Sequence, residues 1–228
     1  MDICKMPEVL FEDNHLLVVN KSAGQLVHGD QTGDPTLLDH CKAYIKESYN
    51  KPGNVFLQPC HRLDRPVSGV LIFARTSKAI DRMNALFRTQ QVEKFYWAMS
   101  DRMPDEVEGE VSDILLLKDR KKNVVKIVED HPDAQLASTS YRLLAELAQK
   151  YLWELKPVTG RSHQLRVTMK HLGMPIIGDL KYGHKEGLGS SIALHCRQMT
   201  FVHPVRKTEI EVKCQPPEEY PWSEMTNM

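Results

Sequence analysis

The sequence predicts one domain that contains both strands and helices. Its 228 residues are enough for one large hydrophobic core without disulfides or metals. Short apolar runs rich in β-branched and aromatic residues predict strands, and apolar stripes with helical spacing predict helices that pack against them. The sequence contains no repeat of 20 to 50 residues and no low-complexity segment, which excludes solenoid and disordered classes.

The first part of the chain alternates between the two kinds of element. Residues 9–20 predict two strands joined by a turn at Glu12-Asp13-Asn14. Helices are predicted to begin at Thr36 and at Thr76, because each threonine precedes an apolar stripe and can cap a helix. Residues 70–74 lie between these helices and predict a buried strand, since they are apolar and β-branched.

The rest of the chain is richer in strands. One helix is predicted from about Ser162 to Gly173, with Leu165, Met169 and Leu172 as its core stripe. The chain is predicted to end in a β-hairpin. The predicted strands cover residues 94–99, 124–128, 139–148, 151–158, 194–202 and 208–213.

Charge and cysteine content restrict the class of protein. Lys+Arg and Asp+Glu each total 30, so a nucleic-acid partner would need a local basic face, such as residues 118–126 or 161–185. Five widely spaced cysteines without a Cys-x-x-Cys motif predict reduced thiols in a cytoplasmic protein. We expect no export and no membrane span, and the histidines lack the spacing of a metal site.

One carboxylate lies in an unusual setting at residues 60–74. Asp64 lies between Arg62 and Arg65, just before the predicted buried strand. Pro66 fixes its own φ angle and keeps Arg65 out of the helical region, and Gly69 allows close backbone approach, so we expect Asp64 on a stiff loop. Such a loop suits a catalytic group. A surface salt bridge at the start of a strand is the plainer interpretation.

Two further segments offer polar side chains on predicted elements. Alternation within residues 94–99 places Tyr96 on the face opposite the larger apolar residues, although a half-buried structural tyrosine would look the same. On the predicted helix, His163, Arg166 and Lys170 form a basic stripe near Arg161, which suits a phosphate at a helix N-terminus. A solvated helix face is the alternative.

Five motifs in order resemble the signatures of the RluA-like pseudouridine synthases. They are His61–Gly69, Lys94–Ala98, Gly160–Arg166, Pro175–Asp179 and Leu194-His195, and the resemblance extends over about residues 9–213. It implies an α+β domain with the pseudouridine synthase fold: a bent, mostly antiparallel mixed sheet flanked by helices, with a central RNA-binding cleft. It also implies isomerisation of specific uridines in tRNA or large-subunit rRNA, with base flipping and without cofactor or metal.

The resemblance also implies roles for single residues. Asp64 matches the family's essential aspartate, Tyr96 its active-site tyrosine and Arg166 the basic residue that pairs with the aspartate. Arg62 resembles positions that fill the space left by the flipped base or hold the rearranged RNA. We assign Arg161, His163 and Lys170 to RNA phosphates, and the basic loop at residues 118–126 is equally a candidate RNA contact or a solvated turn.

The remaining expectations concern organisation and alternatives. We expect one catalytic domain over residues 1–228, with no separate N-terminal RNA-binding domain, a poorly ordered tail at 214–228, a monomer, and RNA as the partner with no obligate protein partner. An inactive RNA-binding protein of the same fold is the main alternative. A glycoside hydrolase would need a second carboxylic acid as proton donor, whereas these motifs offer arginines and a tyrosine.

Overall fold

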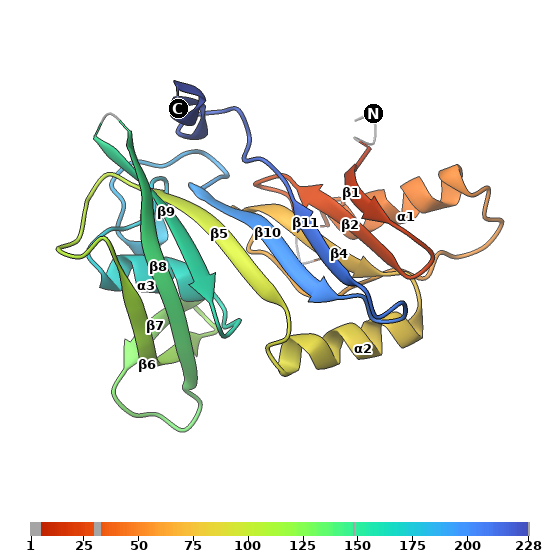
Figure 1. Ribbon diagram of the computed structural model, residues 1–228, viewed down its shortest axis with the longest axis horizontal. Coiled ribbons are helices and arrows are strands. Elements are labelled where there is room, and N and C mark those ends of the chain that lie inside the picture. The colour runs from red at the N-terminus through yellow and green to blue at the C-terminus, as the bar shows by residue number, and fades with distance from the viewer. Residues whose placement is uncertain (1–5, 30–32, 148, 228) are drawn as a thin grey trace. The chain divides into compact units, whose positions relative to one another are not determined.

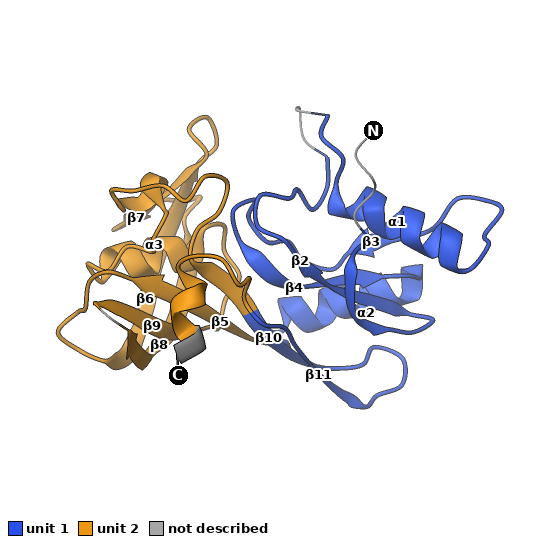
Figure 2. Ribbon diagram, turned by 90° about the horizontal axis from the view of Figure 1, so that it is seen from above, with its two compact units in different colours: residues 1–92, 197–215 blue, residues 93–196, 216–228 orange. Residues whose placement is uncertain are grey.

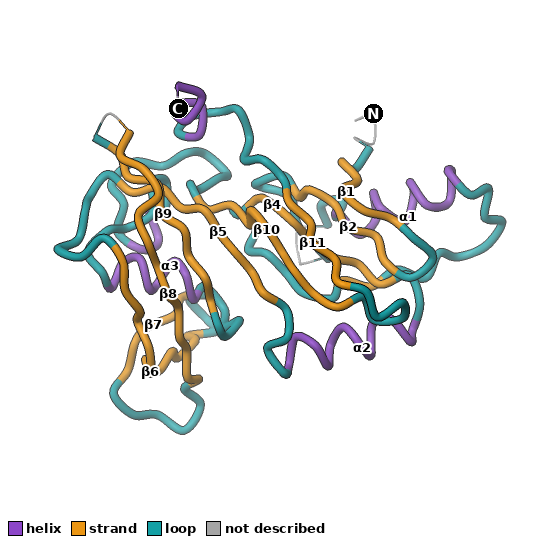
Figure 3. The backbone as a smooth tube through the Cα atoms, viewed as in Figure 1, coloured by secondary structure: helices purple, strands orange, loops and turns teal. Residues whose placement is uncertain are grey.

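The computed structural model describes residues 6–29, 33–147 and 149–227. The chain divides into two compact units, coloured separately in Figure 2. The first unit contains residues 1–92 and 197–215, and the second contains residues 93–196 and 216–228. Helices and strands occur in both units (Figures 1 and 3), which confirms the predicted α+β class.

The first unit is built on a sheet ordered β1-β2-β4-β10, with β3 beside β4 and β11 beside β10. Its strands are β1 (Glu8–Glu12), β2 (Leu16–Lys21), β3 (Gln58–Pro59), β4 (Ser68–Ala74), β10 (Leu194–Val202) and β11 (Glu209–Lys213). β10 begins within the second unit and continues into the first. All seven residues of β4 are buried, as the apolar run at 70–74 predicted. This central strand therefore gives the preceding loop a rigid support.

Two helices accompany this sheet, α1 (Leu37–Ser48) and α2 (Ser77–Arg88). Thr36 and Asp39 form a reciprocal capping box at the start of α1, with both bonds at 3.1 Å. The Thr76 hydroxyl accepts a hydrogen bond from the N–H of Ala79 and caps α2, which packs against β4. Both helix starts are confirmed as predicted.

The second unit has an antiparallel sheet ordered β5-β9-β8-β6-β7. Its strands are β5 (Glu93–Ser100), β6 (Glu108–Asp119), β7 (Val124–Val128), β8 (Gln135–Leu147) and β9 (Lys150–Pro157). β6 was not predicted, because its first half is acidic and mostly exposed. Pairing with both β7 and β8 holds this segment in the sheet despite its weak apolar pattern.

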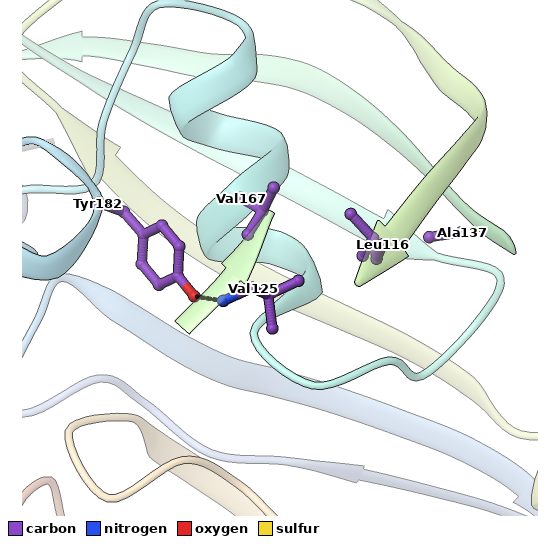
Figure 4. Packing of buried hydrophobic residues seen from close by; sticks show 5 residues of the cluster. All are labelled: Leu116, Val125, Ala137, Val167 and Tyr182. Carbon is purple, nitrogen blue, oxygen red and sulfur yellow. Dashed lines mark hydrogen bonds between the residues drawn. The ribbon is translucent and has the colours of Figure 1, made fainter. Parts of the chain in front are cut away.

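A helix and a 3₁₀ turn cover part of this sheet, α3 (Gln164–His171) and η1 (Leu180–Tyr182). Figure 4 shows the buried cluster that joins them to the strands. It consists of Leu116, Val125, Ala137, Val167 and Tyr182. The Tyr182 hydroxyl accepts a hydrogen bond of 2.9 Å from the Val125 N–H, so this ring has a polar anchor within an apolar cluster.

The C-terminal residues differ from the predicted poorly ordered tail. A 3₁₀ helix, η2, spans Trp222–Asn227, and the Trp222 ring is buried in edge contact with the His195 ring. Glu224 accepts a hydrogen bond of 2.8 Å from Lys150, whose Nζ also lies 5.1 Å from the Tyr220 ring centroid. Two aromatic side chains and one ion pair thus anchor a segment that was predicted from the sequence to be poorly ordered.

Within the described residues, Cys41, Cys60, Cys196 and Cys214 are buried and are not joined in disulfides, while Cys4 lies outside these residues. In the part of the chain that the structure describes, no helix is long and apolar enough to cross a membrane.

Candidate active site

Asp64 lies on the loop that connects β3 to β4 in the first unit. The loop is attached to β4 before it reaches Asp64: the Cys60 N–H donates to the Ile72 carbonyl at 2.9 Å, and the Ile72 N–H donates to Nε2 of His61 at 3.1 Å. The His61 ring lies 5.1 Å from the Phe87 ring. These contacts fix the chain three residues before the carboxylate.

The loop is also held after Asp64. The Val67 N–H donates to the Asp64 carbonyl at 3.0 Å and closes a turn. Gly69 follows at φ +118°, a conformation that glycine adopts far more readily than other residues. The partly exposed Asp64 is therefore carried on the stiff loop that the sequence predicted.

Lys21, at the end of β2, holds the Asp64 loop and was not singled out from the sequence. Its side chain is fully buried, and Nζ donates hydrogen bonds to the carbonyls of Ser22 (3.0 Å), Arg65 (3.1 Å) and Val67 (2.7 Å). Two of these carbonyls, those of Arg65 and Val67, follow Asp64 in the loop. One lysine thus ties β2 to the backbone on the C-terminal side of Asp64.

Two opposing effects act on the pKa of Lys21. Burial lowers the pKa of Lys21 to about 7, and the nearby Asp64 carboxylate opposes this lowering. Only the ammonium form has three N–H donors for three carbonyls, because the neutral amine has two. The charged form therefore matches the observed geometry, and it places a cation close to Asp64.

The two arginines beside Asp64 have different surroundings. Arg65 donates from Nε to the Gly24 carbonyl at 2.9 Å and pairs with Asp34 at 3.0 Å, with both side chains about half exposed. Arg62 is exposed. Arg65 therefore connects the Asp64 loop to Gly24 and Asp34. The exposed Arg62 can be reached by a large ligand.

Tyr96 lies on β5 of the second unit, opposite Leu155 of β9. Its side chain is 9% exposed and shares the buried face of the strand with Lys94 and Ala98. Burial lowers the pKa of Lys94. The predicted alternation is correct, and the more buried face is the one that carries Tyr96, whereas Trp97 on the other face is only half-buried.

Arg166 lies on α3 and is buried together with Asp179. Nε donates to Oδ2 of Asp179 and Nη2 donates to Oδ1, both at 2.7 Å, and the two side chains are 7% and 1% exposed. This is a bidentate, charge-assisted pair with a fixed orientation. Asp179 lies in one of the five sequence motifs, but its partner could not be inferred from the motif alone.

The start of α3 is fixed by a buried glutamine. Gln164 accepts hydrogen bonds from the Thr159 hydroxyl (2.7 Å) and the Arg161 N–H (2.9 Å). Its amide nitrogen donates to the Ser138 carbonyl and the Thr139 hydroxyl, both at 2.9 Å. Gln164 therefore joins the preceding turn to β8 and sets the position from which Arg166 extends.

The basic stripe predicted on this helix is not a continuous exposed surface. His163 precedes α3 in the left-handed conformation, at φ 50°, and is buried like Arg166. Arg161 and Lys170 are exposed. The sequence predicted the spacing of the basic residues correctly but not the burial of His163 and Arg166. The residues of η1 that cover them lie more than ten positions later in the chain.

The predicted site residues are thus divided between the units. Arg62 and Asp64 lie in the first, and Tyr96, Arg161, His163, Arg166 and Lys170 lie in the second. Within the described ranges, no group of three His, Cys, Asp or Glu side chains could hold a metal ion.

Comparison with known proteins gives this set of residues a context. Residues 15–171 match the family model of RNA pseudouridylate synthases. The chain belongs to this family. The matched range contains Asp64, Tyr96 and Arg166, and the family resemblance predicted from the five motifs is confirmed.

Individual pseudouridine synthases resemble the chain over most of its length. tRNA pseudouridine synthase C of Vibrio vulnificus is 33% identical over 92% of this chain and 91% of the relative. Ribosomal large subunit pseudouridine synthase C of Vibrio cholerae is 32% identical over 90% of this chain, which spans only 64% of that relative. The solved structure of Human RNA Pseudouridylate Synthase Domain Containing 4 has a TM-score of 0.78 and 28% identity, covering 96% of this chain and 92% of that one. The pseudouridine synthase fold is therefore confirmed.

Proposed function

We propose that this RNA pseudouridine synthase isomerises specific uridines in tRNA or large-subunit rRNA, with Asp64, Tyr96 and Arg166 as its catalytic residues. The observation that carries the proposal is the family match over residues 15–171, which contains all three. The rigid attachment of the Asp64 loop supports it, because a reacting carboxylate must be held in place.

The reaction needs a carboxylate but no oxidant or cofactor. The bond between N1 of uracil and C1′ of ribose breaks, the base turns, and C5 bonds to C1′. The C5 proton is then lost and N1 takes up a proton, so that the product is an isomer of the substrate. An ionised Asp64 can attack the sugar, stabilise an oxocarbenium-like state or remove a sugar proton. The Lys21 side chain, which binds the carbonyls of Arg65 and Val67, holds the loop that carries Asp64 in each of these roles.

Arg166 and Tyr96 supply two further functions. Asp179 engages Nε and Nη2 of Arg166, and a guanidinium has five N–H donors, so Arg166 can serve a second carboxylate as well. We assign Asp64 as that second carboxylate. Tyr96 is assigned to stack on the uracil and to take part in removal of the C5 proton.

The target uridine must leave the RNA stack before it reacts, at a cost of a few kcal/mol. We assign the exposed Arg62, two residues before Asp64, to the rearranged RNA. The exposed Arg161 and Lys170 are assigned to backbone phosphates. His163 is buried, and its ring lies 2.6 Å from the Tyr182 hydroxyl, which favours a positioning role over a phosphate contact.

The substrate class stays open between two RNAs. The relatives above are named for tRNA in one case and for the large ribosomal subunit in the other. We propose that the protein acts as a monomer in the cytoplasm, where both RNAs are found.

Mapping pseudouridine by mass spectrometry, after specific chemical labelling, tests the proposal directly. Total tRNA and rRNA are compared between cells with and without the gene, and between cells rescued with the wild type and with Asp64→Asn. We expect one or a few positions to be lost and to return only with the wild type. No change at any position, together with no activity of the purified protein on these RNAs, would favour the inactive RNA-binding alternative.

Neutralising Arg161 or Lys170 tests the assigned phosphate contacts. Each lost contact should reduce the salt dependence of RNA affinity by up to about one unit in the slope of log K against log[salt]. The measurement is RNA affinity between 50 and 200 mM salt for Arg161→Gln and Lys170→Gln, with Lys51→Gln as an exposed control outside both predicted basic faces. An unchanged slope in both variants would place the RNA elsewhere.

A further inference from the structure

The Arg166 side chain is held from two directions within the second unit. Asp179 binds its edge through two hydrogen bonds of 2.7 Å, and the ring of Tyr182 lies against its face, with Cζ 4.9 Å from the ring centroid. Asp179 and Tyr182 are each 1% exposed. A buried ion pair contributes little net stability, because both charges lose their hydration on burial. The main consequence of the Arg166–Asp179 pair is therefore that the guanidinium has a fixed orientation.

The Tyr182 ring is itself fixed by its hydroxyl. The oxygen accepts a hydrogen bond from the Val125 N–H at 2.9 Å and lies 2.6 Å from Nδ1 of His163 (Figure 4 shows the first contact). The hydroxyl can donate its own proton to Nδ1 in the His163 tautomer that carries its proton on Nε2. The ring is therefore tied to β7 on one side and to the start of α3 on the other.

Asp179 and Tyr182 come from one short turn, which explains how two contacts reach one guanidinium. The Tyr182 N–H donates to the Asp179 carbonyl at 3.1 Å. Gly178 precedes them at φ +88°, and a Cβ there would lie 2.8 Å from Cγ of Leu188, so only glycine fits without a shift. The turn thus presents a carboxylate and an aromatic ring, three residues apart, to Arg166.

We propose that Asp179 and Tyr182 are positioning residues that fix Arg166 for its work on the reacting carboxylate, and that His163 fixes Tyr182. This inference rests on the proposed function of Arg166. Asp179 engages the Nε side of the guanidinium, which directs the Nη1 donors away from Asp179. An arginine with four rotatable side-chain bonds would otherwise adopt many rotamers, and a displacement of about 1 Å can cost roughly a hundredfold in rate.

Two variants separate the two contacts, and a third serves as control. Asp179→Asn keeps the side-chain shape but loses the charge and one acceptor for the guanidinium. Tyr182→Phe keeps the ring over Arg166 and loses the hydroxyl contacts to His163 and Val125. Leu180→Ala changes an exposed residue of the same turn. Circular dichroism and thermal melting establish that each variant is folded at the assay temperature.

The first readout is the single-turnover rate. We expect a loss of about ten- to a hundredfold for Asp179→Asn and about two- to tenfold for Tyr182→Phe. RNA affinity should stay within about twofold, because Asp179 and Tyr182 are buried. A slower chemical step with unchanged RNA affinity in a folded variant is what a positioning role predicts, and a general loss of stability would not produce that combination.

The second readout does not depend on activity. It is the hydrogen-exchange rate of the Arg166 Nε–H, measured by NMR. This signal is assigned because it is absent from the spectrum of Arg166→Lys. We expect exchange at least about tenfold faster in Asp179→Asn, because the proton loses its carboxylate acceptor. Faster exchange is also expected in Tyr182→Phe, whereas Leu180→Ala should match the wild type.

Wild-type rate and exchange in both folded variants would overturn the inference, and if Asp179→Asn does not fold, Tyr182→Phe decides it alone. An inactive wild type would overturn the proposed function, while the exchange rates would still test how Arg166 is held.

Discussion

Asp64→Asn is expected to abolish pseudouridine formation, with a single-turnover rate at least about a thousandfold below the wild type. The amide has the shape of the carboxylate but can neither attack the sugar nor stabilise its developing positive charge. RNA affinity should remain within about threefold, since the variant removes a negative charge near a polyanion and no phosphate contact. The measurements are single-turnover kinetics and RNA binding at fixed salt.

Asp34→Asn provides a matched control in the same unit. Asp34 is half exposed and pairs with Arg65, next to Asp64 in the chain. Loss of an exposed ion pair costs at most about 1 kcal/mol, so this variant should keep nearly the wild-type rate. Substantial turnover by Asp64→Asn would remove the catalytic assignment, and loss of RNA binding would assign Asp64 to substrate binding instead.

Tyr96→Phe is expected to bind RNA like the wild type and to react about a hundredfold more slowly or worse, because a positioned acid or base contributes about that much. The phenyl ring keeps the stacking surface and the buried packing on β5, so only the hydroxyl is tested. Single-turnover rates at several pH values are the measurement.

The control for this variant is Tyr151→Phe, a tyrosine on β9 of the same unit that is assigned no role. It should keep the wild-type rate. If Tyr96→Phe did the same, the hydroxyl would be idle, and the contribution of Tyr96 would be limited to its ring.

Local signals predicted most of the elements in this protein. The two helix caps and the buried strand β4 were all predictable because their causes lie within a few residues of one another. β6 was missed for the opposite reason. Its acidic residues carry little strand signal, and its place in the sheet comes from its partners β7 and β8.

The site shows the same division between local and distant causes. The spacing of Asp64 between arginines, with proline and glycine after it, correctly predicted a stiff loop. Lys21 gave no signal, because two of its three acceptors are 44 and 46 residues away. The burial of Arg166 depends on Asp179, 13 residues later, and a helical wheel of α3 alone makes Arg166 part of a solvent-facing stripe.

The hydrogen bonds of Lys21 also determine which substitutions leave the Asp64 loop attached. Its three acceptors are main-chain carbonyls, which every amino acid supplies. Changes in the side chains of Ser22, Arg65 or Val67 therefore leave these acceptors in place, whereas a change at Lys21 removes all three bonds at once. A single substitution at Lys21 is therefore enough to release the loop, whereas a single side-chain change at any one of its acceptors is not.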